Sequence, residues 1–555
     1  MQAADIIVTN ARILTMDKIS PRAEALAITG NRLVAVGKQE EVTGLKAKHT
    51  RVIDARGKTV LPGIIESHVH IFPGSVELDS LMVTGVEGID ALAKAVRSYA
   101  NKRPDDRIIV ANGANYMTIR PTGVITRHDL DQVLPDRPFI LCCFDHHTVW
   151  ANTAALKAAD ILHGRDLPPG NEIVMGPDGL ALGELKEFAA YGPVFALTPT
   201  QGRESLGLTT GEGPVPPASA ADRRTDKAAL KRGLAYCASL GITSIHNMDG
   251  NFYQLELLDA LRQDGDLICR VQVPWHQKNV FAPERVDEAV EMRARYNDDM
   301  LYSGRVKIFM DGVIESMTAL MLDDYPGHPG ERGFALFTAE EFNAVAARAD
   351  RHGLQIGVHA IGDAAVRRTL DGYEHARKMN GKRDSRHRIE HIEVIDPADI
   401  PRLKELGVVA SLQPIVGLGV PGVPLEPCRE RIGAKLPYSY AWQTLRAAGA
   451  HMSFSSDWPV SPLDPLQGMQ SAMTQSPIAA NCPPQRQTLM DTLAAFTSDG
   501  AYTEFAEAKK GRLVPGLLAD VVVYDGDLEA TRPEELAKIK PTVTICDGKV
   551  TFEAA

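Results

Sequence analysis

The chain has 555 residues, 44% of them hydrophobic and 24% charged, and this composition is typical of a large globular protein. Its formal net charge of −11 argues against nucleic acid as a partner, because phosphate binding requires an excess of Lys and Arg. No window approaches the roughly 18 apolar residues of a membrane span, and the N-terminal segment has no signal-peptide pattern. With seven cysteines and no CxxC pair, these features predict a cytoplasmic protein with reduced thiols and no membrane partner.

The two ends of the chain are rich in short β patterns separated by turn residues. Four apolar runs carry these patterns, at residues 5–15, 25–37, 519–525 and 543–550. The pair Gly30-Asn31, between two halves of the second run, is typical of a hairpin turn. We therefore predict a composite β-sandwich built from residues 1–60 and 500–555.

Residues 61–499 alternate apolar strands with helical patterns, which predicts βα units and an α/β fold. Eight such units would make a (β/α)8 TIM-type barrel with its active site at the C-terminal ends of the strands. After the opening strand that ends near residue 69, the expected strands are 139–144, 243–246, 305–309, 354–359, 388–391, 408–412 and 451–456.

Two stretches exceed what a minimal barrel needs. Residues 71 to about 138 are predicted to form an inserted subdomain, and residues from about 160 to 225 a long loop. Loops of this length are usually lids or binding elements, or else disordered. For residues 196–222 a lid, a partner contact and disorder all stay open.

His68 and His70 close the opening strand of the predicted barrel. Residues i and i+2 of a strand point to the same side, so the two imidazoles aim into one space. Two converging neutral imidazoles make half of a metal site. The alternative is a pair of ordinary surface or core histidines.

Four more polar residues end apolar runs in other βα units: Lys307, His359, His391 and Asp457. A barrel would bring these strand ends together, and the set suits Zn²⁺, Mn²⁺ or Fe²⁺. Lys307 could instead pair with Asp311, and Asp457 could cap a helix.

These residues lie within motifs that run along most of the chain. In order they are residues 61–63, 68–70, 306–312, 359–363, 388–391, 411–414, 455–460 and 511–523. Together they resemble the amidohydrolase superfamily, most closely the branch that contains N-substituted formamide deformylase and the YtcJ-like hydrolases.

The resemblance implies a divalent metal cofactor, one or two ions per chain, with Zn²⁺ expected first and Mn²⁺ or Fe²⁺ as alternatives. It implies that Asp457 completes the site of His68 and His70. A second ion would be held by His359 and His391. Lys307, carbamylated by CO₂, would be the carboxylate that bridges the two ions, because a protonated ammonium cannot bind a cation.

The same resemblance implies the catalytic groups. Metal-activated water would lose its proton to Asp457, which would return it to the leaving nitrogen. His147 resembles a substrate-side histidine that polarises the scissile carbonyl or holds the oxyanion, with a loop network as the alternative. Ordinary core packing is the alternative for the expected substrate contacts, which are Phe72, Tyr116, Trp150 and Trp458.

The predicted function is hydrolysis of a non-peptide C–N bond in a small amide or formamide with a hydrophobic or aromatic N-substituent. A deaminase of an aminated heterocycle would use one metal and an unmodified Lys307. An esterase or lactonase would use the same site, and a scaffold would have lost catalysis. The expected partner is a small-molecule substrate, and a homodimer is compatible with the family.

Overall fold

The computed structural model describes residues 3–120, 123–144, 147–168 and 170–554. The chain forms two compact units, Met1–His70 with Leu234–Ala555, and Ile71–Gly233. The stretches that the sequence predicted as a separate subdomain and a long loop both fall within the second unit. In the first unit, therefore, the chain leaves directly after His70 and returns at Leu234.

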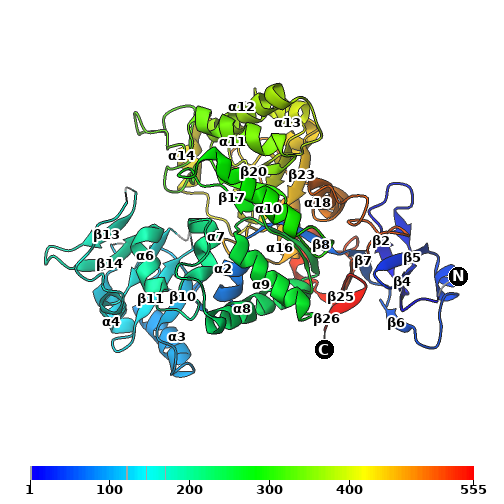
Figure 1. The fold of residues 1–555 in the computed structure, drawn as a ribbon, viewed down its shortest axis with the longest axis horizontal. Helices are drawn as coiled ribbons and strands as arrows, with labels where there is room; N and C mark the ends of the chain where they lie inside the picture. Colours follow the sequence, from blue (N-terminus) through cyan, green and yellow to red (C-terminus); the bar gives the residue numbers. More distant parts are fainter. Residues whose placement is uncertain (1–2, 121–122, 145–146, 169, 555) are drawn as a thin grey trace. The chain divides into compact units, whose positions relative to one another are not determined.

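The strands near the two ends of the chain form two sheets of the first unit. One sheet has the order β5 (Arg32–Gly37), β4 (Ala25–Thr29), β1 (Ile6–Thr9) and β6 (Arg51–Asp54). The other has the order β26 (Lys549–Glu553), β25 (Pro541–Cys546), β24 (Val521–Tyr524), β7 (Thr59–Pro62), β2 (Arg12–Leu14) and β3 (Arg22–Ala23). Both ends of the chain meet in this second sheet because β24 pairs with β7, as the red and blue strands of Figure 1 show.

Side chains from both of these sheets share one hydrophobic cluster. Val8 and Leu26 come from the first sheet, and Val60, Val521 and Ile545 come from the second. Burial of such side chains stabilises the fold by about 25 cal/mol for each Å² of apolar surface removed from water. The alternation of apolar and polar residues in the terminal segments is therefore used to build this shared core.

In the middle of the first unit, the described strands pair with one another in parallel. One sheet has the order β18 (Leu301–Tyr302), β16 (Arg270–Gln272), β15 (Ile242–Asn247) and β8 (Ile64–Val69). The other has the order β17 (Trp275–His276), β19 (Arg305–Phe309), β20 (Gln355–Ala360), β21 (Arg388–His391), β22 (Val409–Leu412) and β23 (His451–Phe454). The α/β class is as predicted, but among the described residues these strands form two sheets, with an isolated parallel bridge between Val69 and Trp458.

The structure differs from the strand prediction in two respects. The run at 139–144 is a strand, as predicted, but it forms β11 (Phe139–Cys143) in the sheet of the second unit and not among the parallel strands of the first. The strands β16, β17 and β18 were not predicted, and in β16 Arg270 and Gln272 interrupt the apolar pattern. An apolar run marks a buried strand but carries no information about which sheet buries it.

The second unit has its own mixed sheet and its own core. Its strand order is β13 (Glu172–Met175), β14 (Ala181–Lys186), β12 (Thr148–Ala151), β11, β10 (Ile109–Ala114) and β9 (Leu81–Met82). Helix α3 (Ile89–Asn101) and helix α4 (Arg127–Val133) contribute Leu92 and Leu130 to one of its hydrophobic clusters.

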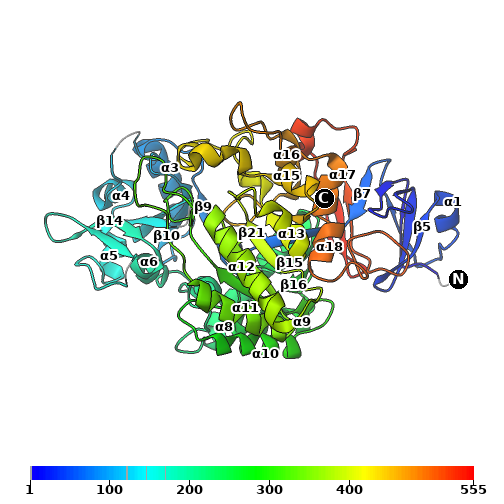
Figure 2. The ribbon, with the colours of Figure 1, turned by 90° about the horizontal axis from the view of Figure 1, so that it is seen from above.

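Two of the helices that follow the parallel strands, α9 and α11, begin at side-chain caps. In α9 (Phe252–Gln263), the side chain of Asn251 accepts the N–H of Gln254. Thr338 and Glu341 form a capping box at the start of α11 (Ala339–Arg351), which lies beside α12 (Asp363–Asn380) in Figure 2. Among the described residues, no helix is both long enough and apolar enough to cross a membrane.

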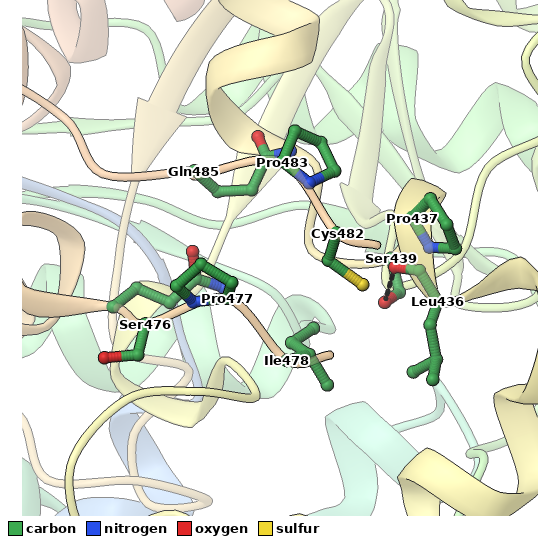
Figure 3. Close-up of a pocket in the computed structure, with 10 residues that line it drawn as sticks. Leu436, Pro437, Ser439, Ser476, Pro477, Ile478, Cys482, Pro483 and Gln485 are labelled. Carbon is green, nitrogen blue, oxygen red and sulfur yellow. Dashed lines mark hydrogen bonds between the residues drawn. The ribbon is translucent and has the colours of Figure 1, made fainter. Parts of the chain in front are cut away.

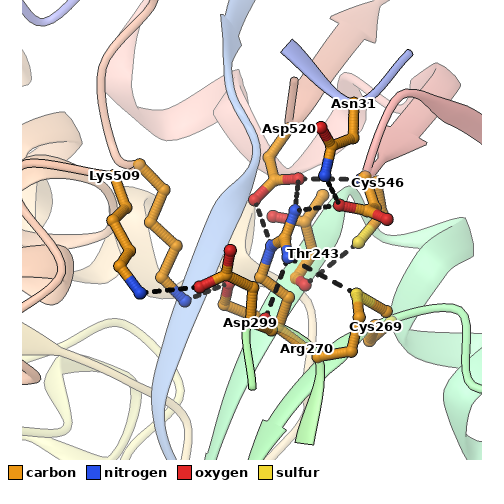
Figure 4. Close-up of polar contacts among 12 residues, drawn as sticks. Asn31, Thr243, Cys269, Arg270, Asp299, Lys509, Asp520 and Cys546 are labelled. Carbon is orange, nitrogen blue, oxygen red and sulfur yellow. Dashed lines mark hydrogen bonds and ion pairs between the residues drawn. The ribbon is translucent and has the colours of Figure 1, made fainter. Parts of the chain in front are cut away.

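A buried ion pair joins the parallel strands to the terminal sheet (Figure 4). On β16, Arg270 donates from Nε and Nη2 to the two oxygens of Asp520, at 2.8 and 2.9 Å. Asp520 also accepts the backbone N–H of Asp547 at 2.9 Å. Both side chains of the pair are almost fully buried. Breaking such a pair leaves one charge buried without compensation.

We predict that Asp520→Ala lowers the free energy of unfolding by about 3–5 kcal/mol. The Arg270 guanidinium loses its buried bidentate partner and keeps the partly exposed Asp547, whose Oδ1 lies 3.0 Å from Nη2. Urea unfolding followed by circular dichroism measures the change. The matched control is Lys509→Ala, which removes the more exposed pair with Asp299 that Figure 4 also shows and should cost about 0.2–1 kcal/mol. Equal effects of the two substitutions would contradict the prediction.

Candidate metal centre

Three buried side chains of the first unit direct their ligand atoms at one point. Asp457 Oδ1 lies 3.2 Å from His68 Nε2 and 3.4 Å from His70 Nε2. The two histidines lie at the end of β8, and Asp457 follows β23. The ligand atoms of this group all lie within 4.8 Å of one another. Parallel strands therefore bring together residues that are far apart in the sequence.

The backbone of Asp457 is unusual, with a φ of +63°. A left-handed conformation costs a residue other than glycine about 1–2 kcal/mol, although Asp tolerates it better than most. Strand β8 holds this turn, because Asp457 N donates to His68 O at 2.9 Å and His70 N donates to Trp458 O at 2.8 Å. Strand β8, which carries the histidines, thus also fixes the backbone around Asp457.

A second layer of carboxylates orients the first two histidines. His68 Nδ1 lies 2.9 Å from Glu390 Oε2, and His70 Nδ1 lies 3.0 Å from Asp249 Oδ1. An ionised carboxylate can only accept, so each Nδ1 carries the hydrogen and each Nε2 can offer a lone pair to a cation.

The charge around His70 is suited to a cation. Burial opposes protonation of this ring, but Asp249 and Asp457 outweigh burial and raise the pKa of His70 to about 9. For Asp457, burial is likewise outweighed, and His68 in particular holds the pKa of the carboxyl well below its usual range. The site therefore favours positive charge, either a proton on His70 or a metal ion in its place.

Two further histidines lie beside this group. The ring centroid of His391 is 5.0 Å from that of His68 and 4.5 Å from that of His359. Burial lowers the pKa of His391 to about 3 and that of His359 well below its usual value. Both rings are therefore neutral, as metal ligation requires.

The partners of these two rings differ. His391 Nδ1 lies 2.8 Å from Gln413 Oε1, which leaves Nε2 for a ligand. His359 Nε2 lies 3.0 Å from Gly312 O, and a carbonyl can only accept, so Nδ1 is the nitrogen of His359 that offers a lone pair. The two histidines would thus bind through different nitrogens.

Lys307 is fully buried, and its Nζ has no hydrogen-bond partner among the described residues. The Nζ atom lies 4.7 Å from the centroid of the Phe309 ring. Burial lowers the pKa of Lys307 to about 8. Asp311 is not its partner, because that carboxylate accepts three backbone N–H groups at 2.9–3.0 Å.

The residues present fit a divalent cation. Asp457 Oδ1 lies close to both imidazole nitrogens yet makes no hydrogen bond of good geometry among the described residues. Lone pairs that converge without a shared hydrogen are what a cation would satisfy. Two imidazoles and a carboxylate are a donor set typical of Zn²⁺ and also suited to Mn²⁺ or Fe²⁺.

The remaining predicted site residues are distributed over both units. His147 lies in the second unit, where its Nδ1 is 2.9 Å from Glu187 Oε1. Phe72 and Trp150 in that unit are 1% exposed, whereas Tyr116 is 48% exposed. Trp458 directly follows Asp457, and its ring packs on Tyr236 within the first unit.

Three residues of the site did not emerge from the sequence. Asp249 and Gln413 are the partners of His70 and His391, and both follow strands that had been identified. His276, on β17, is paired in register with Lys307 and lies with its ring centroid 5.3 Å from that of Phe309. A polar residue just beyond an apolar strand was the available signal for Asp249 and Gln413.

Figure 3 shows a shallow depression that is not part of this centre. It is lined by proline, apolar and amide side chains, with Cys482 the thiol among them. No acidic, basic or histidine side chain is among its lining residues, so it lacks the cluster of ligand groups found at the candidate metal centre.

Comparison with known proteins places these features in a family. Residues 51–552 match the model of the "Amidohydrolase family". The chain is 27% identical to putative amidohydrolase YtcJ of Bacillus subtilis, over 98% of each chain. It is 25% identical to N-substituted formamide deformylase of Arthrobacter pascens, over 100% of this chain and 99% of that protein. The crystal structure of an uncharacterized metal-dependent hydrolase from Pyrococcus horikoshii superposes with a TM-score of 0.74 at 22% identity, covering 95% of this chain and 99% of the other.

We predict that Asp249→Ala weakens Zn²⁺ binding by about 10- to 100-fold, because the ring of His70 loses the carboxylate that orients it. Competition with a chromophoric chelator measures the affinity. The control is Asp105→Ala, at an exposed position of the other unit, which should leave the affinity unchanged. An unaltered affinity in the Asp249 variant would show that His70 does not bind the metal in this orientation.

Proposed function

The chain belongs to the amidohydrolase family and is a hydrolytic enzyme, and from this premise we propose that it cleaves a non-peptide C–N bond in a small amide or formamide with metal-activated water. The observation that carries the proposal is the convergence of His68 and His70 on Asp457 at the ends of parallel strands. The similarity to N-substituted formamide deformylase of Arthrobacter pascens supports this substrate class.

We infer that the two parallel sheets are parts of one (β/α)8 barrel. Support comes from the isolated bridge between Val69 and Trp458, which links the end of β8 to the segment after β23. The hydrogen bond from Asp457 N to His68 O joins the same two segments. A barrel explains why all ligand candidates of the first unit lie at strand ends on one side.

We propose two metal sites. His68, His70 and Asp457 would hold one ion, and His359 Nδ1 with His391 Nε2 would hold the other. A bound divalent cation would supply Lewis acidity toward water and toward the substrate carbonyl. Zn²⁺ is the first candidate for this donor set.

The protein's own groups would then move the proton and hold the substrate. The Asp457 carboxylate would accept the proton of the attacking water and return it to the leaving nitrogen. We propose that His147, whose ring is held by Glu187, donates a hydrogen bond to the substrate carbonyl oxygen. The aromatic side chains proposed to contact the N-substituent remain Phe72, Tyr116, Trp150 and Trp458.

Lys307 is proposed to carry a carbamate. Its amine nitrogen would attack the carbon of CO₂, an N–C bond would form, and one N–H proton would be released. As the N–C bond forms, one C=O π bond of CO₂ opens, so the product has two oxygens that share a single negative charge where the protonated side chain has a cation. The burial of Lys307 and the lack of a hydrogen-bond partner for Nζ among the described residues support this modification.

We predict that protein purified without chelator contains close to two divalent ions per chain and hydrolyses N-substituted formamides or amides. Asp457→Asn should lower kcat by about 10²- to 10⁴-fold through loss of proton transfer. Elemental analysis and a substrate panel that includes esters and aminated heterocycles test both statements. The control for the metal site is the His68→Ala/His70→Ala variant. Absence of metal after reloading with Zn²⁺ or Mn²⁺ and bicarbonate would refute the proposal.

Lys307→Met should reduce the metal content from about two ions to about one, because the bridging carboxylate cannot form. Native mass spectrometry of the unsubstituted protein should show the added mass of one CO₂, and this mass should be absent from the variant. The control is His68→Ala, which should keep the added CO₂ if the carbamate forms before the first ion binds. One ion per chain with an unmodified Lys307 would favour the deaminase reaction instead.

A further inference from the structure

One buried carboxylate on the histidine strand has no role in the proposed ligand set. Glu66 lies two residues before His68 on β8, and its side chain is fully buried. Its Oε1 accepts from Ser456 N at 2.6 Å and from Ser456 Oγ at 3.1 Å. Its Oε2 has no hydrogen-bond partner among the described residues. The two hydrogen bonds of good geometry to this carboxyl group therefore both come from Ser456.

Ser456 immediately precedes Asp457, and its hydroxyl contacts the residue on the other side of Asp457 as well as Glu66. The Ser456 hydroxyl donates to Glu66 and accepts from Trp458 N at 3.1 Å. Glu66 thus holds the Ser455–Ser456 peptide directly and, through the Ser456 hydroxyl, the Asp457–Trp458 peptide. A side chain that could not accept hydrogen bonds would leave these two donors of Ser456 buried and without a partner.

Strand β8 therefore holds the Asp457 turn at three successive positions. Glu66 binds Ser456, the carbonyl of His68 binds Asp457 N, and the N–H of His70 binds Trp458 O. Glu66, His68 and His70 are every second residue along β8 and its end, whereas the three residues that they hold, Ser456, Asp457 and Trp458, are consecutive. Asp457, in the centre, is the residue with the left-handed φ of +63°.

We propose that Glu66 is a positioning residue of the metal centre: through Ser456 it fixes the left-handed turn that presents Asp457 Oδ1 to His68 and His70. The inference deepens the proposed function and depends on it in taking Asp457 as a metal ligand. Glu66 itself contacts neither metal nor substrate in this role.

The variants separate the hydrogen-bond acceptor from the charge and the volume. Glu66→Gln keeps an oxygen that can accept from Ser456. Glu66→Leu removes the acceptor and keeps similar bulk, whereas Glu66→Asp keeps the carboxylate but shortens its reach by one methylene. If Glu66→Leu does not fold, Glu66→Asp is the more conservative substitution with which the proposal can still be tested.

Co²⁺ affinity of the full-length protein, with the visible absorption spectrum of the bound ion, is the readout. We expect Glu66→Gln to bind within threefold of the unsubstituted protein. Glu66→Asp and Glu66→Leu should bind at least tenfold more weakly and with an altered spectrum. Retained affinity in both weakened variants would overturn the inference, and so would an equally large loss in Glu66→Gln.

A merely structural role is distinguished by repeating the measurements in an Asp457→Ala background. If Glu66 acts through Asp457, its substitution should change the remaining Co²⁺ affinity by less than twofold there. Equal losses in the two backgrounds would mean a general disturbance of the strand and would refute the positioning role. Failure of the unsubstituted protein to bind Co²⁺ would refute the proposed function itself, which is a different outcome from normal binding by all Glu66 variants.

Discussion

The buried ion pair between Arg388 and Glu390 is the interaction on which the metal centre depends. Both side chains are fully buried on β21, and Glu390 Oε2 is the partner of His68 Nδ1. The guanidinium also binds one group on each of three other strands. It donates to Ser67 O on β8 and to Ser411 Oγ on β22, each at 2.7 Å, and to His246 Nδ1 on β15 at 3.0 Å. The Arg388 guanidinium therefore holds the Glu390 carboxylate in place, and that carboxylate orients His68.

The electrostatics around this pair are consistent with that role. Burial opposes ionisation of Glu390, but Arg388 and His68 outweigh burial and hold its pKa well below the usual range. Burial lowers the pKa of His246 to about 4, so its ring stays neutral and can accept from the guanidinium. A buried pair is weak evidence for stability, because apolar residues of similar volume often serve as well. The orientation of His68 is a better explanation for its presence here.

The candidate metal ligands could be chosen from the sequence because they share a local signature. His68, Lys307, His359 and His391 each lie in or at the end of an apolar strand, and parallel strands of a sheet end on the same side. The assignment of strands to sheets was less successful: β11 proved to be part of the second unit, and β16 was not identified. Both errors arose because hydrophobicity reports burial but not the neighbour that provides it.

The partners of His70 and His359 could not be predicted in the same way. The contact of His70 with Asp249, and that of His359 with the carbonyl of Gly312, depend on rotamers and on the path of loops. No periodic pattern encodes such contacts, and a carbonyl partner leaves no mark in the sequence at all. The nitrogen that each ring offers to a cation is therefore a property of the folded protein.

Backbone strain supports the view that the site is built before it binds. His391 and Asp457 have φ values of +78° and +63°, a conformation that few residues other than glycine adopt. Such residues persist only where the surroundings over-determine them, and they cluster at functional sites. At Asp457 the surroundings are the successive hydrogen bonds from β8. Because the strand that carries two of the proposed ligands also imposes the strained turn of the third, folding sets the relative geometry of the three side chains.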